Sequence, residues 1–170
     1  MRATLLGSTA ALAAVLLIGT ACRHAGEYPQ TAAGMGVGTY VDHQDKSASQ
    51  TSAEHNYQAD QGVRLEFTNV TTDPVAASPG QQVQLVATYA LMAPDAQQHF
   101  QVTEDRLVTL NGEKVAPQTS TTVDRTPGTW TSKVSLTLSP TAAKGTCQLQ
   151  VTASAAEGPS CQLACSFTVE

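Results

Sequence analysis

Residues 83–91, Val-Gln-Leu-Val-Ala-Thr-Tyr-Ala-Leu, carry the clearest structural signal in this chain. Apolar side chains recur at every second position, from Val83 and Leu85 through Tyr89 to Leu91. A period of two places these side chains on one face of an extended segment. The stretch therefore predicts a β-strand with one buried face.

The same alternation continues on both sides of this stretch. It begins at Val63 upstream, and downstream it returns from Phe100, from Trp130 and from Leu149. Turn-forming pairs separate the segments: Asp73-Pro74, Asn111-Gly112, Pro127-Gly128 and Glu157-Gly158. Asn-Gly is a strong signal for a two-residue hairpin, because both turn positions need positive φ. Seven to nine strands with turns at this spacing predict an all-β, antiparallel β-sandwich over residues 62–170.

Composition limits the partners of the chain. The 170 residues include 14% charged and 5% aromatic side chains, with a formal net charge of −5. There is no basic cluster, and phosphate binding needs concentrated Lys and Arg, so we expect no nucleic-acid partner.

The first 22 residues are organised differently from the rest. A positive charge at Arg2 precedes an apolar run from Leu5 to Ile18, and small residues follow. This is the layout of a secretory signal peptide. The run is shorter than the ~20 apolar residues needed to span a bilayer core.

The segment Ile18-Gly19-Thr20-Ala21-Cys22 resembles the lipobox of bacterial lipoproteins, with Gly19 where that family usually has Leu. The resemblance implies removal of residues 1–21 and acylation of Cys22, for example with palmitate. Such proteins generally carry more than one acyl chain, as stable membrane anchoring requires. By the family's sorting rule, Arg23 favours the outer membrane of a Gram-negative envelope. The alternative is plain secretion with Cys22 free or in a disulfide.

Residues 22–61 show no sustained apolar period, and residues 42–60 are almost entirely polar. Such a segment buries too little apolar surface to offset its ordering entropy, so we expect a flexible tether. It contains potential metal ligands whose spacing matches no familiar site, and we assign no metal to them: Asp42, His43, Asp45, Glu54 and His55. A weaker alternative is that Tyr40, Val41 and Tyr57 dock a short segment on the domain.

Two segments of the body resemble immunoglobulin-like and fibronectin-type-III-like modules of bacterial surface proteins. One is Ser78-Pro79-Gly80-Gln81-Gln82-Val83, and the other extends from Gly128-Thr129-Trp130 to Gly145-Thr146. The resemblance implies an immunoglobulin-like sandwich, an architecture that serves spacers, adhesins and docking surfaces alike. The chain departs from the pattern at Cys147, where these modules normally have Tyr.

The remaining cysteines are Cys147, Cys161 and Cys165. Four residues of extended strand separate the last two by about 13 Å, too far for a disulfide. Cys147 and Cys165 each share parity with core positions, so we expect a Cys147–Cys165 disulfide. The alternatives are Cys147–Cys161, three buried thiols, or an intermolecular bridge.

The sequence offers no familiar catalytic constellation or cofactor motif. The body contains a single histidine, His99, which we expect at the surface. We expect Glu104-Asp105-Arg106 on a solvated edge and Trp130 in the core. No catalytic residue and no cofactor is therefore assigned.

The leading functional hypothesis is a non-enzymatic envelope lipoprotein, whose tethered domain binds or scaffolds another envelope protein or a surface polymer. One alternative is a carbohydrate-binding module, which needs a row of exposed aromatic side chains. Others are a secreted structural or adhesive domain and, least favoured, a hydrolase on a β-sandwich.

Overall fold

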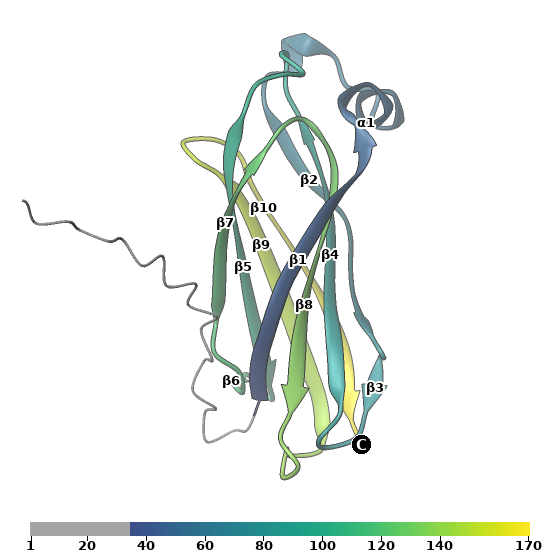
Figure 1. Ribbon diagram of the computed structural model, residues 1–170, viewed down its shortest axis with the longest axis vertical. Helices are drawn as coiled ribbons and strands as arrows, with labels where there is room; N and C mark the ends of the chain where they lie inside the picture. Colours follow the sequence, from purple (N-terminus) through teal and green to yellow (C-terminus); the bar gives the residue numbers. More distant parts are fainter. Residues whose placement is uncertain (1–34) are drawn as a thin grey trace, which may run out of the picture.

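The computed structural model describes residues 35–170, which form two β-sheets (Figure 1). The signal peptide 1–21, Cys22 and residues 23–34 of the expected tether lie outside the described residues. The four-stranded sheet is antiparallel, in the order β1 (Met35–Ser47), β8 (Gly128–Leu138), β4 (Gln82–Met92) and β2 (Arg64–Asp73).

The six-stranded sheet has a more varied construction. Its main path is β3 (Ala76–Ala77), β10 (Ser160–Val169), β9 (Gly145–Ala155), β5 (Phe100–Leu110) and β6 (Glu113–Lys114), and β7 (Thr119–Arg125) also pairs with β5. The β3–β10 pair is parallel. The expected purely antiparallel sandwich is therefore wrong in this detail, whereas a mostly β fold of two sheets is confirmed. Nine of the ten strands lie within residues 62–170, and two of these have only two residues each.

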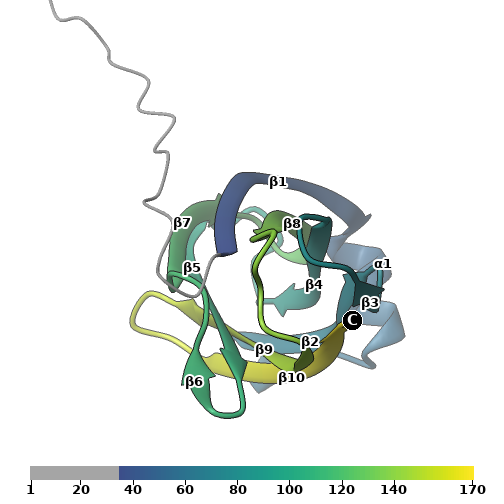
Figure 2. The same cartoon turned by 90° about the horizontal axis from the view of Figure 1, so that it is seen from below.

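The two sheets face each other, as the end-on view shows (Figure 2), and the largest cluster of buried apolar side chains lies between them. Val83 and Leu136 from the four-stranded sheet and Leu149 and Phe167 from the six-stranded sheet are almost completely buried. The period of two seen in the sequence supplies this core, because every second side chain points into the space between the sheets.

The Asn111-Gly112 turn forms as predicted. Both residues have positive φ, 52° and 85°, and the turn joins Leu110 of β5 to Glu113 of β6. The side-chain-free Gly112 fits this conformation without the steric cost that other residues would meet.

The expected tether is wrong from Met35 onward. This segment forms β1, helix α1 (Ala48–Glu54) and the 3₁₀ turn η1 (Ala59–Gln61). Backbone pairing with β8, from Met35↔Leu138 to Ser47↔Gly128, orders β1 although most of its side chains are exposed. The polar composition of this segment did not reveal that it forms a strand. An edge strand is held by backbone hydrogen bonds, which do not depend on apolar side chains.

Helix α1 is capped at its start and is tied to the four-stranded sheet by specific contacts. The Ser47 side chain and Gln50 form a capping box at the helix start, which satisfies free backbone N–H groups. On the helix, Thr51 Oγ1 lies 2.9 Å from Thr129 Oγ1 of β8, and beyond it Tyr57 packs on Ala90 and Met92. Tyr57 therefore docks as the weaker alternative proposed, whereas Val41 is 54% exposed.

The described cysteines are free thiols, so the expected Cys147–Cys165 disulfide is absent from this part of the chain. Cys147 lies opposite Phe167 in the β9–β10 pair, and Cys165 lies opposite Leu149. The parity prediction placed the two cysteines on one face, but the register offsets them by two residues. Diagonal neighbours of this kind have Cα atoms about 7–8 Å apart, at or beyond the reach of a disulfide.

No helix within residues 35–170 is both long and apolar enough to cross a bilayer.

Candidate functional site

Three charged side chains lie buried between the sheets. Glu104 is 1% exposed, Arg106 2% and Arg125 4%. The expectation of a solvated edge at residues 104–106 is therefore wrong for two of the three residues. β5 lies between β9 and β7, so its alternation turns Glu104 and Arg106 inward with Val102 and leaves Asp105 on the outer face.

Glu104 is the centre of a hydrogen-bonded cluster. Its Oε1 accepts from the hydroxyls of Tyr40 and Tyr89, both at 2.9 Å. Its Oε2 accepts from Arg106 Nη2 at 2.8 Å and from Ser132 Oγ at 2.6 Å. Each carboxylate oxygen thus has two donors, which nearly fills its acceptor capacity.

Arg125 connects this cluster to the edge strand β1. Its Nη2 forms an ion pair with Asp42 and donates to the Tyr40 hydroxyl at 2.9 Å, while its Nε donates to the Tyr89 hydroxyl at 3.1 Å. The guanidinium also lies 4.2 Å from the centre of the Trp130 ring, a cation–π geometry. We call the whole set the interior ion network: Tyr40, Asp42, Tyr89, Glu104, Arg106, Arg125 and Ser132.

The network keeps Glu104 ionised. Burial alone raises the pKa of this carboxyl, but the Arg106 charge and the hydrogen bonds from Ser132, Tyr89 and Arg106 outweigh it and lower the pKa below 4.5. Burial and the neighbouring Glu104 charge raise the pKa of Tyr40 and of Tyr89. A fixed carboxylate with neutral phenols is suited to joining strands and poorly suited to proton transfer.

The network is not completely satisfied by protein atoms. Arg106 Nε and Nη1 and Thr119 Oγ1 are buried and have no hydrogen-bond partner within residues 35–170. Arg106 and Thr119 are cross-strand partners in the β5–β7 pair, so these atoms belong to one region of the interior.

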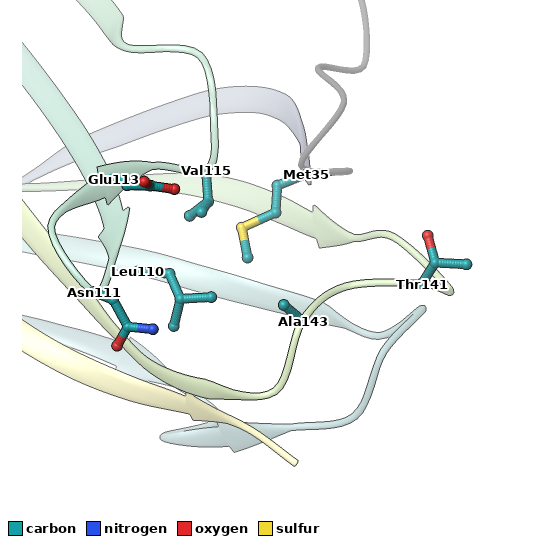
Figure 3. Close-up of a pocket in the computed structure, with 7 residues that line it drawn as sticks. All are labelled: Met35, Leu110, Asn111, Glu113, Val115, Thr141 and Ala143. Carbon is teal, nitrogen blue, oxygen red and sulfur yellow. The ribbon is translucent and has the colours of Figure 1, made fainter.

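A separate hollow of about 490 Å³ lies at the end of the molecule where β1 begins (Figure 3). Met35, Leu110 and Val115 form its apolar floor, and these three residues are buried. Its other lining residues, exposed to solvent, are Asn111, Glu113, Thr141 and Ala143.

A third feature is the outer face of the six-stranded sheet, which we call the hydroxyl–amide face. Cross-strand contacts show its continuity: Thr103 Oγ1 lies 2.9 Å from Thr122 Oγ1, and Ser154 Oγ lies 2.9 Å from Ser160 Oγ. On β5, β7, β9 and β10 the charged side chains of this face are Asp105 and Asp124. Its hydroxyl and amide side chains are Gln101, Thr103, Thr109, Ser120, Thr122, Thr146, Gln148, Gln150, Thr152, Ser154, Ser160, Gln162, Ser166 and Thr168.

The potential metal ligands noted in residues 42–55 are dispersed into separate pairs. His43 contacts Asp45 at 2.8 Å, Lys46 contacts Glu54 at 2.7 Å, and His55 contacts Glu66 at 3.1 Å. Among the described residues, no three His, Cys, Asp or Glu side chains are grouped as a metal site requires. Alternation from Val102 could have indicated the inward side chain of Glu104, but no sequence signal joined it to Arg125 or Tyr40.

Comparison with known proteins gives no functional lead. No family model and no curated protein matches the chain. A family 123 glycoside hydrolase from Clostridium perfringens is 11% identical over 56% of this chain and 22% of its own, with a TM-score of 0.44. The alkylpurine DNA glycosylase AlkC from Pseudomonas fluorescens is 14% identical over 72% of this chain and 34% of its own, with a TM-score of 0.42. The chain thus spans about a fifth and a third of these two proteins, and the likeness is too distant to bear on its activity.

Proposed function

We propose that this protein is a bacterial envelope lipoprotein, held in the membrane through acylated Cys22, whose β domain binds or scaffolds another envelope component without catalysing a reaction. The outer membrane is the proposed location. The partner is an envelope protein or a surface polymer, and nucleic acid is not among the proposed partners.

The hydroxyl–amide face is the observation that carries the binding role. It presents closely spaced donors and acceptors on four adjacent strands, with only Asp105 and Asp124 as charges. Covering such a face costs less desolvation than covering a charged one, and the buried centres of protein interfaces are likewise depleted in charge. Glu104, a carboxylate that could do acid–base chemistry, is instead committed to the interior ion network.

We further propose that the domain is immunoglobulin-like. Two facing sheets and the Ser78–Val83 and Gly128–Trp130 segments support this architecture. The parallel β3–β10 pair departs from a purely antiparallel sandwich.

A carbohydrate-binding module is the less favoured alternative. Stacking on sugar rings needs exposed aromatic side chains, and within residues 35–170 every aromatic residue is buried or partly buried. A secreted structural or adhesive domain is the other alternative, and it differs from the main proposal in the fate of Cys22.

The intact mass of the protein from its native membranes tests the anchor. We expect a chain that starts at Cys22 and carries diacylglyceryl and acyl groups, and a Cys22→Ser variant that lacks them and leaves the membrane fraction. A native mass without lipid would exclude the lipoprotein and favour secretion.

Site-specific photo-crosslinking in intact cells tests the binding face. A photoreactive residue replaces Thr122 or Gln148 on the hydroxyl–amide face, and matched controls replace Lys133 or Thr137 on the opposite sheet; all four side chains are exposed. We expect a discrete adduct from the first pair only. Adducts from the control positions alone, from all four positions equally, or from none would contradict the proposed face.

A further inference from the structure

The hollow at the start of β1 lies where the preceding segment of the chain arrives. Met35 is both the first described residue and one of the residues that line the hollow (Figure 3). Any group on the segment just before Met35 is therefore present at the hollow at high effective concentration, in the millimolar range for short flexible connections.

The lining suits an amphipathic side chain. Figure 3 shows the side chains of Met35, Leu110 and Val115 directed into the hollow, with Asn111 and Glu113 at its margin. A ligand with an apolar body and a polar tip can place its body on the first three and its hydrogen-bonding group near the last two. Tyrosine has this character.

Residues 23–34 contain one aromatic residue and one proline, and these are adjacent: Tyr28-Pro29. The chain from Tyr28 to Met35 reaches at most about 24 Å when extended, enough to return to a hollow that begins at Met35.

We propose that the hollow is a docking site for Tyr28-Pro29 of the chain's own N-terminal segment. The Tyr28 ring occupies the apolar floor, and its hydroxyl meets Asn111 or Glu113. Pro29 limits the conformations of the segment and so lowers the entropic cost of docking.

Docking sets how far the domain stands from its anchor, a consequence that rests on the proposed acylation of Cys22. Twelve residues lie between Cys22 and Met35, so the maximal span is about 45 Å. With Tyr28 docked, the free connection is the five residues between Cys22 and Tyr28, a span of about 20 Å at most. The hollow therefore works as a length control that holds the domain close to the membrane.

Hydrogen exchange measured by mass spectrometry on the full mature protein, purified from membranes in detergent, tests the docking. The variants are Tyr28→Ala and the matched control Gln30→Ala, and thermal unfolding confirms that both fold. We expect Tyr28→Ala to accelerate exchange in residues 110–115 and 26–31 by roughly fivefold or more, and Gln30→Ala to leave both unchanged.

Equal exchange in the two variants, or unprotected exchange of residues 26–31 in the native protein, would overturn the proposal. A Cys22→Ser protein separates it from the anchor: protection of residues 110–115 lost in this variant but kept in Tyr28→Ala would identify an acyl chain as the occupant and also overturn the proposal. Because the intact mass reports acylation independently, failure of the docking and failure of the anchor are distinguishable.

Discussion

Glu104 holds together side chains from four other strands, and its charge is the key to the interior ion network. Replacing it by Gln keeps the size but leaves Arg106 and Arg125 in the interior with less compensating charge. Removing one partner of a buried ion pair costs about 3–5 kcal/mol. We therefore expect Glu104→Gln to lower the free energy of unfolding by about this amount in urea titrations. Asp105→Asn, one residue away on the outer face, is the control and should change the free energy of unfolding by less than about 0.5 kcal/mol. Similar losses of stability in both variants would argue against the network.

The same residue gives the domain a defined acid sensitivity. The pKa of Glu104 is lower in the folded protein than its ordinary value of 4.5, so the unfolded state binds the proton more readily. Its stabilisation is fully present above about pH 4.5 and is lost as the pH falls through the folded pKa below that. The stability gap between wild type and Glu104→Gln should therefore shrink between about pH 4.5 and more acidic conditions, and a gap that stays constant would disprove the assignment.

Cys161 should react slowly although it is only partly buried. Burial raises the pKa of this thiol to about 11, and the thiolate is the reactive form. At neutral pH we expect alkylation of Cys161 by iodoacetamide to be roughly a hundredfold slower than that of a free cysteine. Peptide mapping after timed alkylation measures this, with the urea-unfolded protein as reference. Modification at the unfolded rate would show that the site is open.

At the level of single residues, alternation in the sequence predicted which apolar side chains are buried, but it did not predict which buried polar side chains interact. It placed Val83 and Tyr89 in the core correctly. Glu104 has the same parity as the apolar Val102, but its charge suggested a solvated edge. Partners such as Arg125 and Tyr40 are 21 and 64 residues away in sequence, and only the pairing of strands brings them together.

Strand β1 is the element whose order the sequence concealed, and at its end it pairs with Gly128 of β8. A Cβ atom at Gly128 would lie 2.6 Å from the backbone oxygen of Lys46, and φ is +152° there. We expect Gly128→Ala to push β1 away from β8 and to cost about 2–3 kcal/mol. Hydrogen exchange should rise across residues 35–47 before it rises elsewhere.

Gly36 of the same strand provides the matched control. A Cβ atom at this position meets nothing within 4 Å. Gly36→Ala should therefore leave exchange in β1 unchanged and stability within about 0.5 kcal/mol of wild type or slightly higher. If both glycine variants loosen β1 equally, the close approach at Gly128 is not what positions the strand.

For the whole molecule, the start of the folded unit is the point at which the sequence-based prediction and the structure differ. Composition placed the start of the domain near residue 62, because apolar alternation begins there. The structure includes β1, which pairs with β8 throughout and brings Asp42 and Tyr40 to Arg125. Such an edge strand contributes hydrogen bonds and an ion pair, neither of which changes hydropathy, so no composition shift marks it.

This difference yields a direct test on two shortened chains, residues 35–170 and residues 62–170. Without β1, Arg125 loses the Asp42 carboxylate. The edge of β8 that pairs with β1 also loses its backbone hydrogen-bond partners, while its pairing with β4 remains. Arg125 is buried whereas Asp42 is partly exposed, so the ion pair is only one part of the loss, and the Tyr40 hydrogen bond and the backbone pairing of β1 with β8 are lost with it. Together these losses take up a large part of the roughly 5–15 kcal/mol by which domains of this size are stable. We expect the longer chain to unfold cooperatively in urea and the shorter one to show no cooperative transition, with dispersion of amide resonances as a second measurement. A cooperative transition of the shorter chain at a similar midpoint would mean that β1 is an accessory strand, and that the interior ion network closes without it.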